Sequence, residues 1–148
     1  MTEKYHYKES GLDYIWLEGG WEIVSSPSGK QLKIKNIEQL HNAIGTWLVK
    51  EKKDLTGKEI RFLRQEMRLS QANLAKLLTV TEQTIHRWET GKADIPKPAE
   101  SLIRFLYEGV ETAEIKNALE SLAQLEDDAD GRDYNAKFAN KDWRLQAA

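Results

Sequence analysis

The sequence of 148 residues contains no cysteine, only three histidines and no long apolar run. The lack of cysteine excludes disulfides, thiolate metal sites and cysteine nucleophiles. The three histidines, His6, His41 and His86, are too far apart in the sequence to have the spacing of metal ligands. We therefore expect neither a metal site nor a cofactor.

No apolar run approaches the ~18 residues that a membrane-spanning helix requires. Residues 1–10 are polar and charged, unlike a secretory signal. Together these absences predict a cytoplasmic protein with no membrane partner. Hydrophobic residues make up 40% of the chain and charged residues 31%, a composition typical of a globular protein.

The net charge of −2 gives no sign of nucleic-acid binding by itself, but the charge is unevenly distributed. Residues 1–49 carry a net charge of −1, residues 50–92 carry +4 and residues 93–148 carry −5. Positive charge is thus concentrated in the middle segment, where it could meet a phosphate backbone. A solvated charged surface would give the same pattern.

The first third of the chain is rich in β-forming residues. Two runs, residues 14–17 and 21–24, flank the pair Gly19-Gly20 and predict a hairpin, and the alternation over residues 31–35 predicts a third strand. Apolar residues then recur at helical spacing, at Ile37, Leu40, Ile44, Trp47 and Leu48. For residues 1–50 we therefore expect a small antiparallel β-sheet with one helix, which must pack on a neighbour or a second copy.

Beyond a charge-dense stretch at residues 51–54, predicted to be a linker or the frayed end of the preceding helix, three helix starts follow in succession. Each begins with a residue that can cap a helix, at Thr56, Ser70 and Thr81. Thr56 and Glu59 have the spacing of a capping box. Because the caps lie 14 and then 11 residues apart, they predict three short helices joined by tight turns.

A fourth helix is predicted from about Pro98 to Gly109. A fifth begins near residue 111, with an apolar stripe that can pack on its own domain or across a dimer, at Ile115, Leu119, Leu122 and Leu125. The acidic run at residues 126–131 ends this helix, and we expect a poorly ordered or partner-dependent tail beyond it. The predicted division is residues 1–50 for the β-sheet unit, 51–54 for the linker, 55–110 for the helix-turn-helix and 111–148 for a helix and an acidic, partly disordered tail.

Residues 71–88 have the pattern of two steeply crossing helices that share a small core. The apolar positions predicted to form this core are Leu74, Leu78, Val80, Ile85 and Trp88. On the second helix, Gln83, Thr84 and Arg87 fall on one exposed polar face, since positions i, i+1 and i+4 cluster on a helix. Because an α-helix fits the DNA major groove, this pattern predicts a helix-turn-helix that binds DNA.

The motifs Ser70-Gln71-x-x-Leu74-Ala75 and Thr84-Ile85-x-Arg87-Trp88-Glu89-x-Gly91 closely resemble those of the Cro/cI-like (XRE) helix-turn-helix regulators. Residues 55–64 and 95–100 are similar to the DNA-binding half of MqsA/YgiT-type antitoxins. The resemblance covers about residues 55–109 and implies an all-α, lambda-repressor-like domain of about five helices. The zinc-binding cysteines of MqsA-type N-terminal domains are missing, so their zinc module is not implied.

By this resemblance, Gln71 contacts a backbone phosphate. The positions that match the groove-facing ones are Glu82, Gln83, Thr84, His86 and Arg87. We expect Gln83 to pair with an adenine and Arg87 with a guanine or a phosphate. Arg68, at the end of the first helix, and Lys92, just past the third, are further candidates for phosphate contacts.

Two residues near this motif carry expectations of their own. Thr79 occupies a turn position where the family commonly has a left-handed glycine, and a β-branched residue costs about 1 kcal/mol or more there. Either the turn is distorted or the strain is tolerated. We expect Trp88 to lie in the core, and Glu89 to hold the loop around Gly91 through backbone or arginine bonds.

These patterns predict an α+β protein that is a sequence-specific DNA-binding repressor and acts as a homodimer on double-stranded operator DNA. The alternative is an antitoxin that binds a toxin protein through its acidic last third or its tryptophan-rich N-terminal segment. A third hypothesis is effector sensing, with Trp16 and Trp21 lining a pocket, although a small aromatic core would also gather them. No nucleophile elbow or glycine-rich phosphate loop is present, so we do not expect an enzyme.

Overall fold

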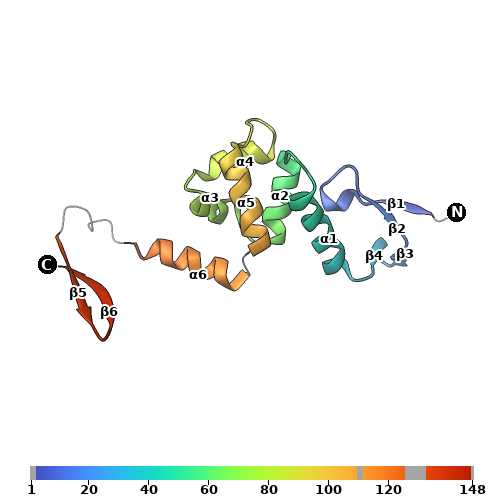
Figure 1. Ribbon diagram of the computed structural model, residues 1–148. Helices are drawn as coiled ribbons and strands as arrows, with labels where there is room; N and C mark the ends of the chain where they lie inside the picture. The colour runs from blue at the N-terminus through green and yellow to red at the C-terminus, as the bar shows by residue number, and fades with distance from the viewer. Residues whose placement is uncertain (1–2, 110–111, 126–132, 148) are drawn as a thin grey trace.

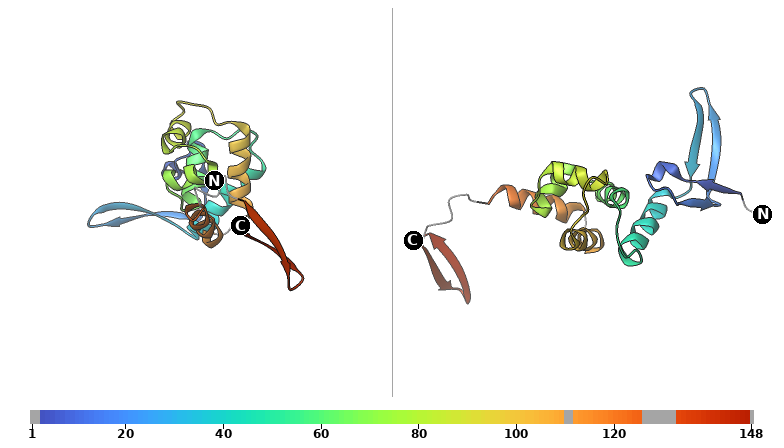
Figure 2. Two further views of the ribbon diagram at one scale, coloured as in Figure 1. Left: turned by 90° about the vertical axis from the view of Figure 1, so that its left-hand side faces the viewer. Right: turned by 90° about the horizontal axis from the view of Figure 1, so that it is seen from above.

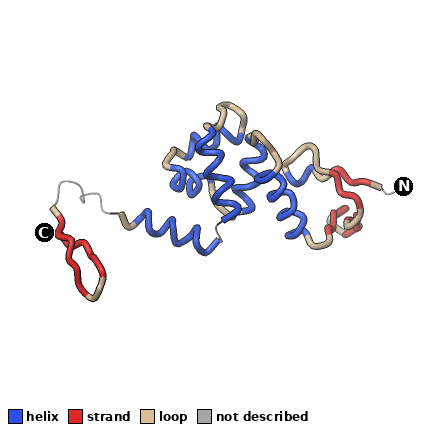
Figure 3. The backbone as a smooth tube through the Cα atoms, in the orientation of Figure 1, coloured by secondary structure: helices blue, strands red, loops and turns tan. Residues whose placement is uncertain are grey.

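The computed structural model describes residues 3–109, 112–125 and 133–147, and it shows strands at both ends of the chain with helices between them (Figures 1 and 3). The small N-terminal β units are antiparallel, and a series of helices follows them. The predicted α+β fold class is therefore confirmed. Among the helices in this part of the chain, none is both long and apolar enough to cross a bilayer.

The N-terminal strands form two separate two-stranded sheets. β1 (Lys4–His6) pairs with β2 (Trp16–Glu18), and β3 (Trp21–Ser26) pairs with β4 (Gly29–Ile34). A short 3₁₀-helix, Lys8–Ser10, lies between β1 and β2. The β3–β4 hairpin projects away from the helices (Figure 2).

The predicted pairing of residues 14–17 with residues 21–24 is wrong. Gly19 and Gly20 do form a turn, with φ angles of 77° and 73°, but this turn leads the chain out of one sheet and into the next. The partner of β2 is the three-residue strand β1, which is too short to show a periodic pattern in the sequence. The third predicted strand is confirmed as β4.

Six helices follow. Their bounds are α1 (Ile37–Lys50), α2 (Gly57–Glu66), α3 (Gln71–Leu78), α4 (Glu82–Glu89), α5 (Lys97–Gly109) and α6 (Thr112–Ala123). The three predicted caps are confirmed, since Thr56, Ser70 and Thr81 each accept a bond from the backbone N–H three residues later. Thr56 and Glu59 make both bonds of the capping box. Local side-chain bonds therefore fix where α2, α3 and α4 begin.

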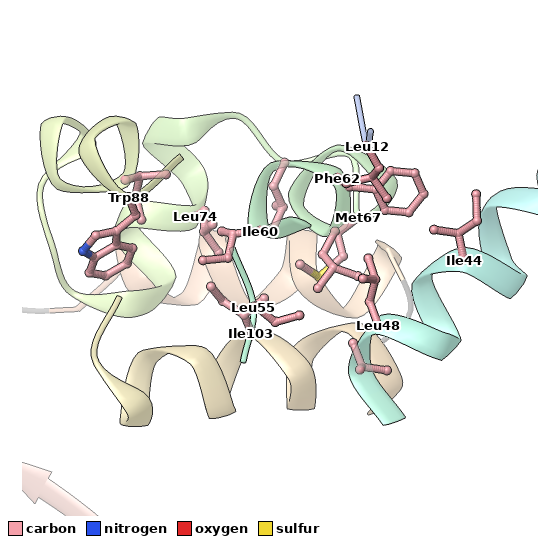
Figure 4. Close-up of a cluster of buried hydrophobic side chains, with 14 of the residues drawn as sticks. Leu12, Ile44, Leu48, Leu55, Ile60, Phe62, Met67, Leu74, Trp88 and Ile103 are labelled. Atoms are coloured by element: carbon pink, nitrogen blue, oxygen red, sulfur yellow. The ribbon is translucent and has the colours of Figure 1, made fainter. Parts of the chain in front are cut away.

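One hydrophobic cluster joins α1 to the helices that follow it (Figure 4). Leu48 of α1, Leu12 of the loop before β2 and Ile60 of α2 are all almost completely buried. The N-terminal unit thus packs on its neighbour, as its small size predicts. The helical core is therefore built from residues on both sides of the predicted linker.

Polar side chains also attach the N-terminal unit to the helices. The Tyr7 hydroxyl lies 2.8 Å from His41 Nε2, and His41 Nδ1 lies 2.8 Å from Glu66 Oε1, so one chain of bonds connects the N-terminal segment, α1 and α2. At the other end of α2, Lys58 Nζ lies 2.8 Å from Asp13 Oδ2. The first strands are therefore connected to α2 by more than the covalent chain.

Arg104 of α5 holds the segment between α1 and α2. Its Nη1 donates to the carbonyls of Leu48 and Val49 at 3.0 and 2.9 Å. Its Nη2 donates to those of Lys52 and Lys53 at 2.7 and 3.1 Å. The last carbonyls of a helix have no partners within the helix, and this guanidinium donates hydrogen bonds to those of α1. The domain boundary placed here stays a prediction, but the segment is not a free connection.

A fully buried carboxylate, that of Glu59, anchors the same segment from α2. It accepts bonds from Lys52 Nζ at 2.7 Å, from the Thr56 backbone N–H at 2.8 Å and from the Tyr14 hydroxyl. Burial alone would raise the pKa of Glu59, but these donors outweigh it and lower the pKa below 4.5. Glu59 therefore stays ionised at neutral pH inside the fold.

The C-terminal segment forms an antiparallel hairpin of β5 (Tyr134–Ala139) and β6 (Asp142–Ala147). The sequence did not predict these strands, and the expectation that the tail is poorly ordered or partner-dependent stays a prediction. Asn140 and Lys141 connect the strands with φ angles of 53° and 65°, the two left-handed residues of a tight hairpin turn. Lysine is an unusual residue at such a position, so the turn was missed. The acidic run at residues 126–131 lies outside the described residues.

Candidate nucleic-acid interface

α3 and α4 are joined by a turn whose first residue, Thr79, has a left-handed backbone with φ 59° and ψ 43°. The Val80 backbone N–H donates to the Ala75 carbonyl at 3.0 Å and so closes the end of α3. The turn is therefore undistorted, and the strain of a β-branched residue is tolerated. The sequence left open whether the turn is distorted or the strain is tolerated, and the structure shows tolerated strain.

The predicted core between the two helices is confirmed. Leu74 of α3 and Ile85 of α4 are completely buried, and Trp88 is 5% exposed. Leu78 and Val80 are half-buried and pack against the same cluster. Trp88 is therefore a core residue, as expected, and one side of α4 is fully used for packing.

The opposite side of α4 is open. Gln83 and Arg87 are exposed, as are two further predicted residues, Glu82 and His86. Thr84 is half-buried, with its hydroxyl 2.8 Å from that of Thr81. The five predicted groove-facing residues thus lie on one eight-residue helix whose buried side fixes their direction.

Gln71 has a partner within the protein, because its Nε2 donates to Glu89 Oε1 at 3.1 Å. Its predicted phosphate contact is not tested by this bond. Gln71 also lines a hollow at the N-terminal end of α3, together with Arg61, Arg64, Ser70, Glu82, His86, Glu89 and Thr90. Arg61 is exposed and was not singled out from the sequence. Its position in the charged segment was the available signal.

A buried ion pair connects α2 to the end of α4. Arg64 donates from Nε to Glu89 Oε2 at 2.6 Å and from Nη2 to Glu89 Oε1 at 3.0 Å. Its Nη1 also donates to the Leu69 carbonyl at 2.8 Å. Of the two partners expected for Glu89, the arginine is confirmed. Arg64 itself was missed, although a charge four residues after Ile60 on the buried face of α2 could have indicated it.

Lys92 and Arg68 are both exposed, but they lie in different places. The Lys92 backbone N–H donates to the Arg87 carbonyl at 2.9 Å, so Lys92 directly follows the end of α4. Arg68 is in the turn after α2 and lines a hollow with Glu38 and His41 of α1. The structure therefore brings Lys92 close to Arg87, whereas Arg68 lies toward α1.

The start of α2 touches the end of α4 through backbone atoms. A Cβ added to Gly57 would lie 2.7 Å from the Glu89 carbonyl oxygen and closer still to that of Trp88. Both neighbours are backbone atoms, which cannot rotate away. Glycine at this position therefore lets α2 and α4 approach each other closely, and this contact fixes the placement of α4.

The N-terminal tryptophans do not form a common site. Trp16 is 57% exposed and stacks on His6 with 4.2 Å between ring centroids, whereas Trp21 is half-buried beside Tyr5. Trp21 lines a shallow hollow with Glu22 and other residues of β3 and β4, and Trp16 does not line it. The expectation that an aromatic core contains Trp16 is thus wrong. The expectation that Trp16 and Trp21 line one pocket has no support from this hollow, because only Trp21 lines it.

A comparison with protein-family models matches residues 56–106 to a helix-turn-helix domain. Searches of curated proteins and of solved structures found no match. The matched range covers α2, α3, α4 and most of α5, about a third of the chain. The middle of the chain is therefore a helix-turn-helix domain, the type of domain that DNA-binding regulators use.

Proposed function

We propose that this protein is a sequence-specific transcriptional repressor of the Cro/cI-like (XRE) class that acts on operator DNA in the cytoplasm. The observation that carries the proposal is the two-sided character of α4. Ile85 and Trp88 bury one side, whereas Gln83 and Arg87 are presented to solvent on the other. A helix held in this way can enter the major groove, where each base pair offers a distinct pattern of donors and acceptors. The proposal includes no catalytic step.

In this proposal the residues of α4 read the bases. Gln83 pairs with an adenine and Arg87 with a guanine or a neighbouring phosphate, since both side chains can make two bonds to those bases. Gln71 contacts a phosphate. Its amide has two N–H groups, and the bond to Glu89 uses one of them, so the second is available for DNA. Arg61, Arg68 and Lys92 supply positive charge toward the backbone.

The repressor acts as a homodimer. One α4 helix covers only half of a binding site, and two copies placed about one helical turn apart, ~34 Å, multiply affinity and specificity. A two-fold operator is the consequence of such an arrangement. The dimer also explains how eight residues of recognition helix can select a site within a genome.

Selection of bound duplexes from a random-sequence pool tests the proposal. We expect an enriched motif with two-fold symmetry and electrophoretic shifts that weaken steeply as salt rises. A variant with Arg87→Ala is run in parallel with Lys116→Ala, whose exposed lysine lies on α6. The Lys116 variant should enrich the same motif as the unmodified protein. Absence of any enriched motif, or binding that ignores salt, would contradict the proposal.

The antitoxin alternative is supported by exposed aromatic residues in the N-terminal unit. Tyr14 and Trp47 contact each other with 6.0 Å between ring centroids, and both are exposed, as is Trp16. Exposed aromatic groups of this kind are typical of surfaces that bind other proteins. Co-expression with the protein of the adjacent gene tests this alternative. A stable complex that Trp47→Ser disrupts would favour it, and no complex would count against it.

A further inference from the structure

The β5–β6 hairpin has one face made of apolar side chains. Residues directly opposite each other in an antiparallel pair share a face, so the register assigns every residue to one of two faces. One face carries Tyr134, Ala136, Phe138, Trp143, Leu145 and Ala147. The other carries Asn135, Lys137, Ala139, Asp142, Arg144 and Gln146. The hairpin is therefore amphipathic along its whole length.

The apolar face is open to solvent. The rings of Phe138 and Trp143 form a cross-strand pair with 5.1 Å between centroids, and both remain more than half exposed. Leu145 is 70% exposed. Large apolar groups gathered on one face indicate an interaction surface, whereas scattered ones do not. A two-stranded hairpin is also only marginally stable in water unless its apolar face is covered.

We infer that a second copy of this chain covers the apolar face of the β5–β6 hairpin, so that the two hairpins pack face to face. This face carries no charge, so two copies can cover each other without burying an unpaired ion. Residues 133–147 have a net charge of only +1, so the two hairpins repel each other little. This interface would join the two copies of the proposed homodimer. Its use in DNA binding rests on the proposed function, but the contact between the hairpins does not.

The charge of the surrounding chain argues for a protein partner rather than DNA at this surface. Residues 93–148 carry a net charge of −5, so this end of the molecule is repelled by a phosphate backbone. The apolar face itself has no basic residue that could neutralise a phosphate. The hairpin is therefore suited to contact protein while the positive middle segment contacts DNA.

α6 extends the same interface. Ile115 is buried and Leu119 packs against the helical core, but Leu122 and Leu125, further along the same stripe, are exposed. The predicted stripe thus packs on its own domain only in its first half. The second half lies nearest in sequence to the hairpin and is available to the second copy.

The hairpin lies apart from α4 (Figure 1). α6 has 12 residues, so it measures ~18 Å, and it packs beside α3 before the chain continues to the hairpin. The contact surface inferred here is therefore separate from the exposed face of α4.

The size of the face predicts a weak dimer in solution. Two paired strands of six residues form a face of about 20 Å by about 10 Å, or about 200 Å². This area is far smaller than the ~800 Å² that each partner contributes to a standard interface. The exposed leucines of α6 enlarge the contact, but dissociation in the micromolar range is expected. Two half-sites on one DNA molecule would then strengthen the pairing through effective concentration.

The mass of the full chain in solution, measured by sedimentation from micromolar to submillimolar concentration, tests the inference. The unmodified protein should move from 17.1 kDa toward twice that mass. Leu145→Lys adds a charge to the apolar face and should weaken the dimer by a factor of about 100 or more, because one leucine is lost from each copy. Gln146→Lys adds the same charge to the neighbouring residue on the polar face and should leave the dimer intact.

A second measurement serves if Leu145→Lys disturbs the hairpin itself. The chain has no cysteine, so Leu145→Cys and Gln146→Cys each introduce a unique thiol. A short bifunctional thiol reagent should join two copies through position 145 and far less through position 146. Equal cross-linking at both positions would overturn the inference.

The remaining outcomes are also decisive. An unmodified chain that stays monomeric throughout, or a Leu145→Lys variant that dimerises as well as the unmodified chain, overturns the inference. In the first case the face belongs to another protein or to none. If the chain dimerises through the hairpin but enriches no DNA motif, the proposed function fails and the interface stands. If DNA is bound and Leu145→Lys leaves the dimer intact, only the interface fails.

Discussion

The guanidinium of Arg64 and the carboxylate of Glu89 form a two-bond ion pair that joins the middle of α2 to the last residue of α4. Glu89 also accepts from Gln71 of α3. One buried carboxylate thus joins α2, α3 and α4, the first three helices of the matched domain. Glu89 is followed by Thr90, the C-cap of the helix whose exposed side is proposed to meet the bases.

Arg64→Met should destabilise the fold strongly, because it leaves the Glu89 carboxylate buried without its cation. We expect the free energy of unfolding to fall by about 3–5 kcal/mol, measured by urea denaturation. Arg61→Met is the control, since Arg61 is an exposed arginine on the same helix and should change stability by less than about 0.5 kcal/mol. Equal effects of the two substitutions would contradict the importance of the pair.

Gly57→Ala should destabilise the protein and displace α4, because the new methyl group would overlap the backbone at the end of that helix. A loss of about 1–3 kcal/mol is expected in thermal or urea unfolding. Gly109→Ala provides the comparison, since nothing lies within 4 Å of the added Cβ and this glycine ends α5. That variant should be neutral or slightly more stable. A neutral Gly57→Ala would show that α2 and α4 can separate without loss.

Thr79→Gly should stabilise the protein, because it removes the strain of a β-branched residue in the left-handed region. A gain of about 1 kcal/mol in unfolding free energy is expected. Thr90→Gly should instead destabilise, because Thr90 has a negative φ of −92° and its hydroxyl donates to the His86 carbonyl at 2.8 Å. A loss of stability in Thr79→Gly would mean that the hydroxyl or methyl group of Thr79 contributes more than the strain.

Arg87→Ala should weaken binding to the selected DNA motif by about 1–3 kcal/mol and relax the base preference at one position. Lys92→Ala should weaken binding to all sequences alike and reduce the dependence of affinity on salt. Affinity measurements on matched and scrambled duplexes over a salt series separate the two effects. Unchanged specificity in Arg87→Ala would exclude it as a base-reading residue.

Acid should destabilise the fold through its buried glutamates. Burial raises the pKa of Glu59 and of Glu100, but bonds from lysine, backbone N–H and other donors outweigh it, so both lie below the usual 4.5. A lowered folded-state pKa gives stability that is present above pH 4.5 and is lost as the pH falls through the folded-state value. Urea denaturation across this range should show the loss.

Glu59→Gln is the control for the acid response, because glutamine has nearly the same shape but cannot titrate, with an amide nitrogen in place of one carboxylate oxygen. Its unfolding free energy should depend less on pH below 4.5 than that of the unmodified chain. Identical acid profiles would assign the effect to other groups.

At high pH the unfolding free energy should change with pH in the opposite direction because of Tyr14. Burial and Glu59 raise the pKa of Tyr14, so stability should fall as the pH rises above 10.

The helical part of the fold was predictable because its signals are local. Each cap at Thr56, Ser70 and Thr81 bonds to a residue only three positions away, so sequence spacing alone identifies it. The exposed face of α4 follows from helical periodicity in the same way. These two kinds of short-range pattern were sufficient to locate the helix-turn-helix and its candidate contact residues.

Contacts between distant residues were not predictable. β2 had two possible partners, and the sequence favoured the glycine-linked neighbour over the three residues of β1. Arg64 and Glu89 are 25 positions apart, and nothing in the pattern of either helix identifies the other as its partner. The pairing of β5 with β6 depends on a left-handed backbone at Lys141. Lysine rarely adopts this conformation, so the sequence did not indicate the turn.

Arg104 and the buried face of α1 have a consequence for how such proteins can evolve. The matched domain begins at residue 56, yet Ile44, Leu48 and Val49 lie in the same cluster as its core, and Arg104 within it bonds to carbonyls before its first residue. A gene rearrangement that exchanged the N-terminal segment at that boundary would uncover part of the core. The helix-turn-helix therefore has to be inherited together with α1, and any segment that replaces the one ahead of α1 has to supply an apolar side chain where Leu12 lies.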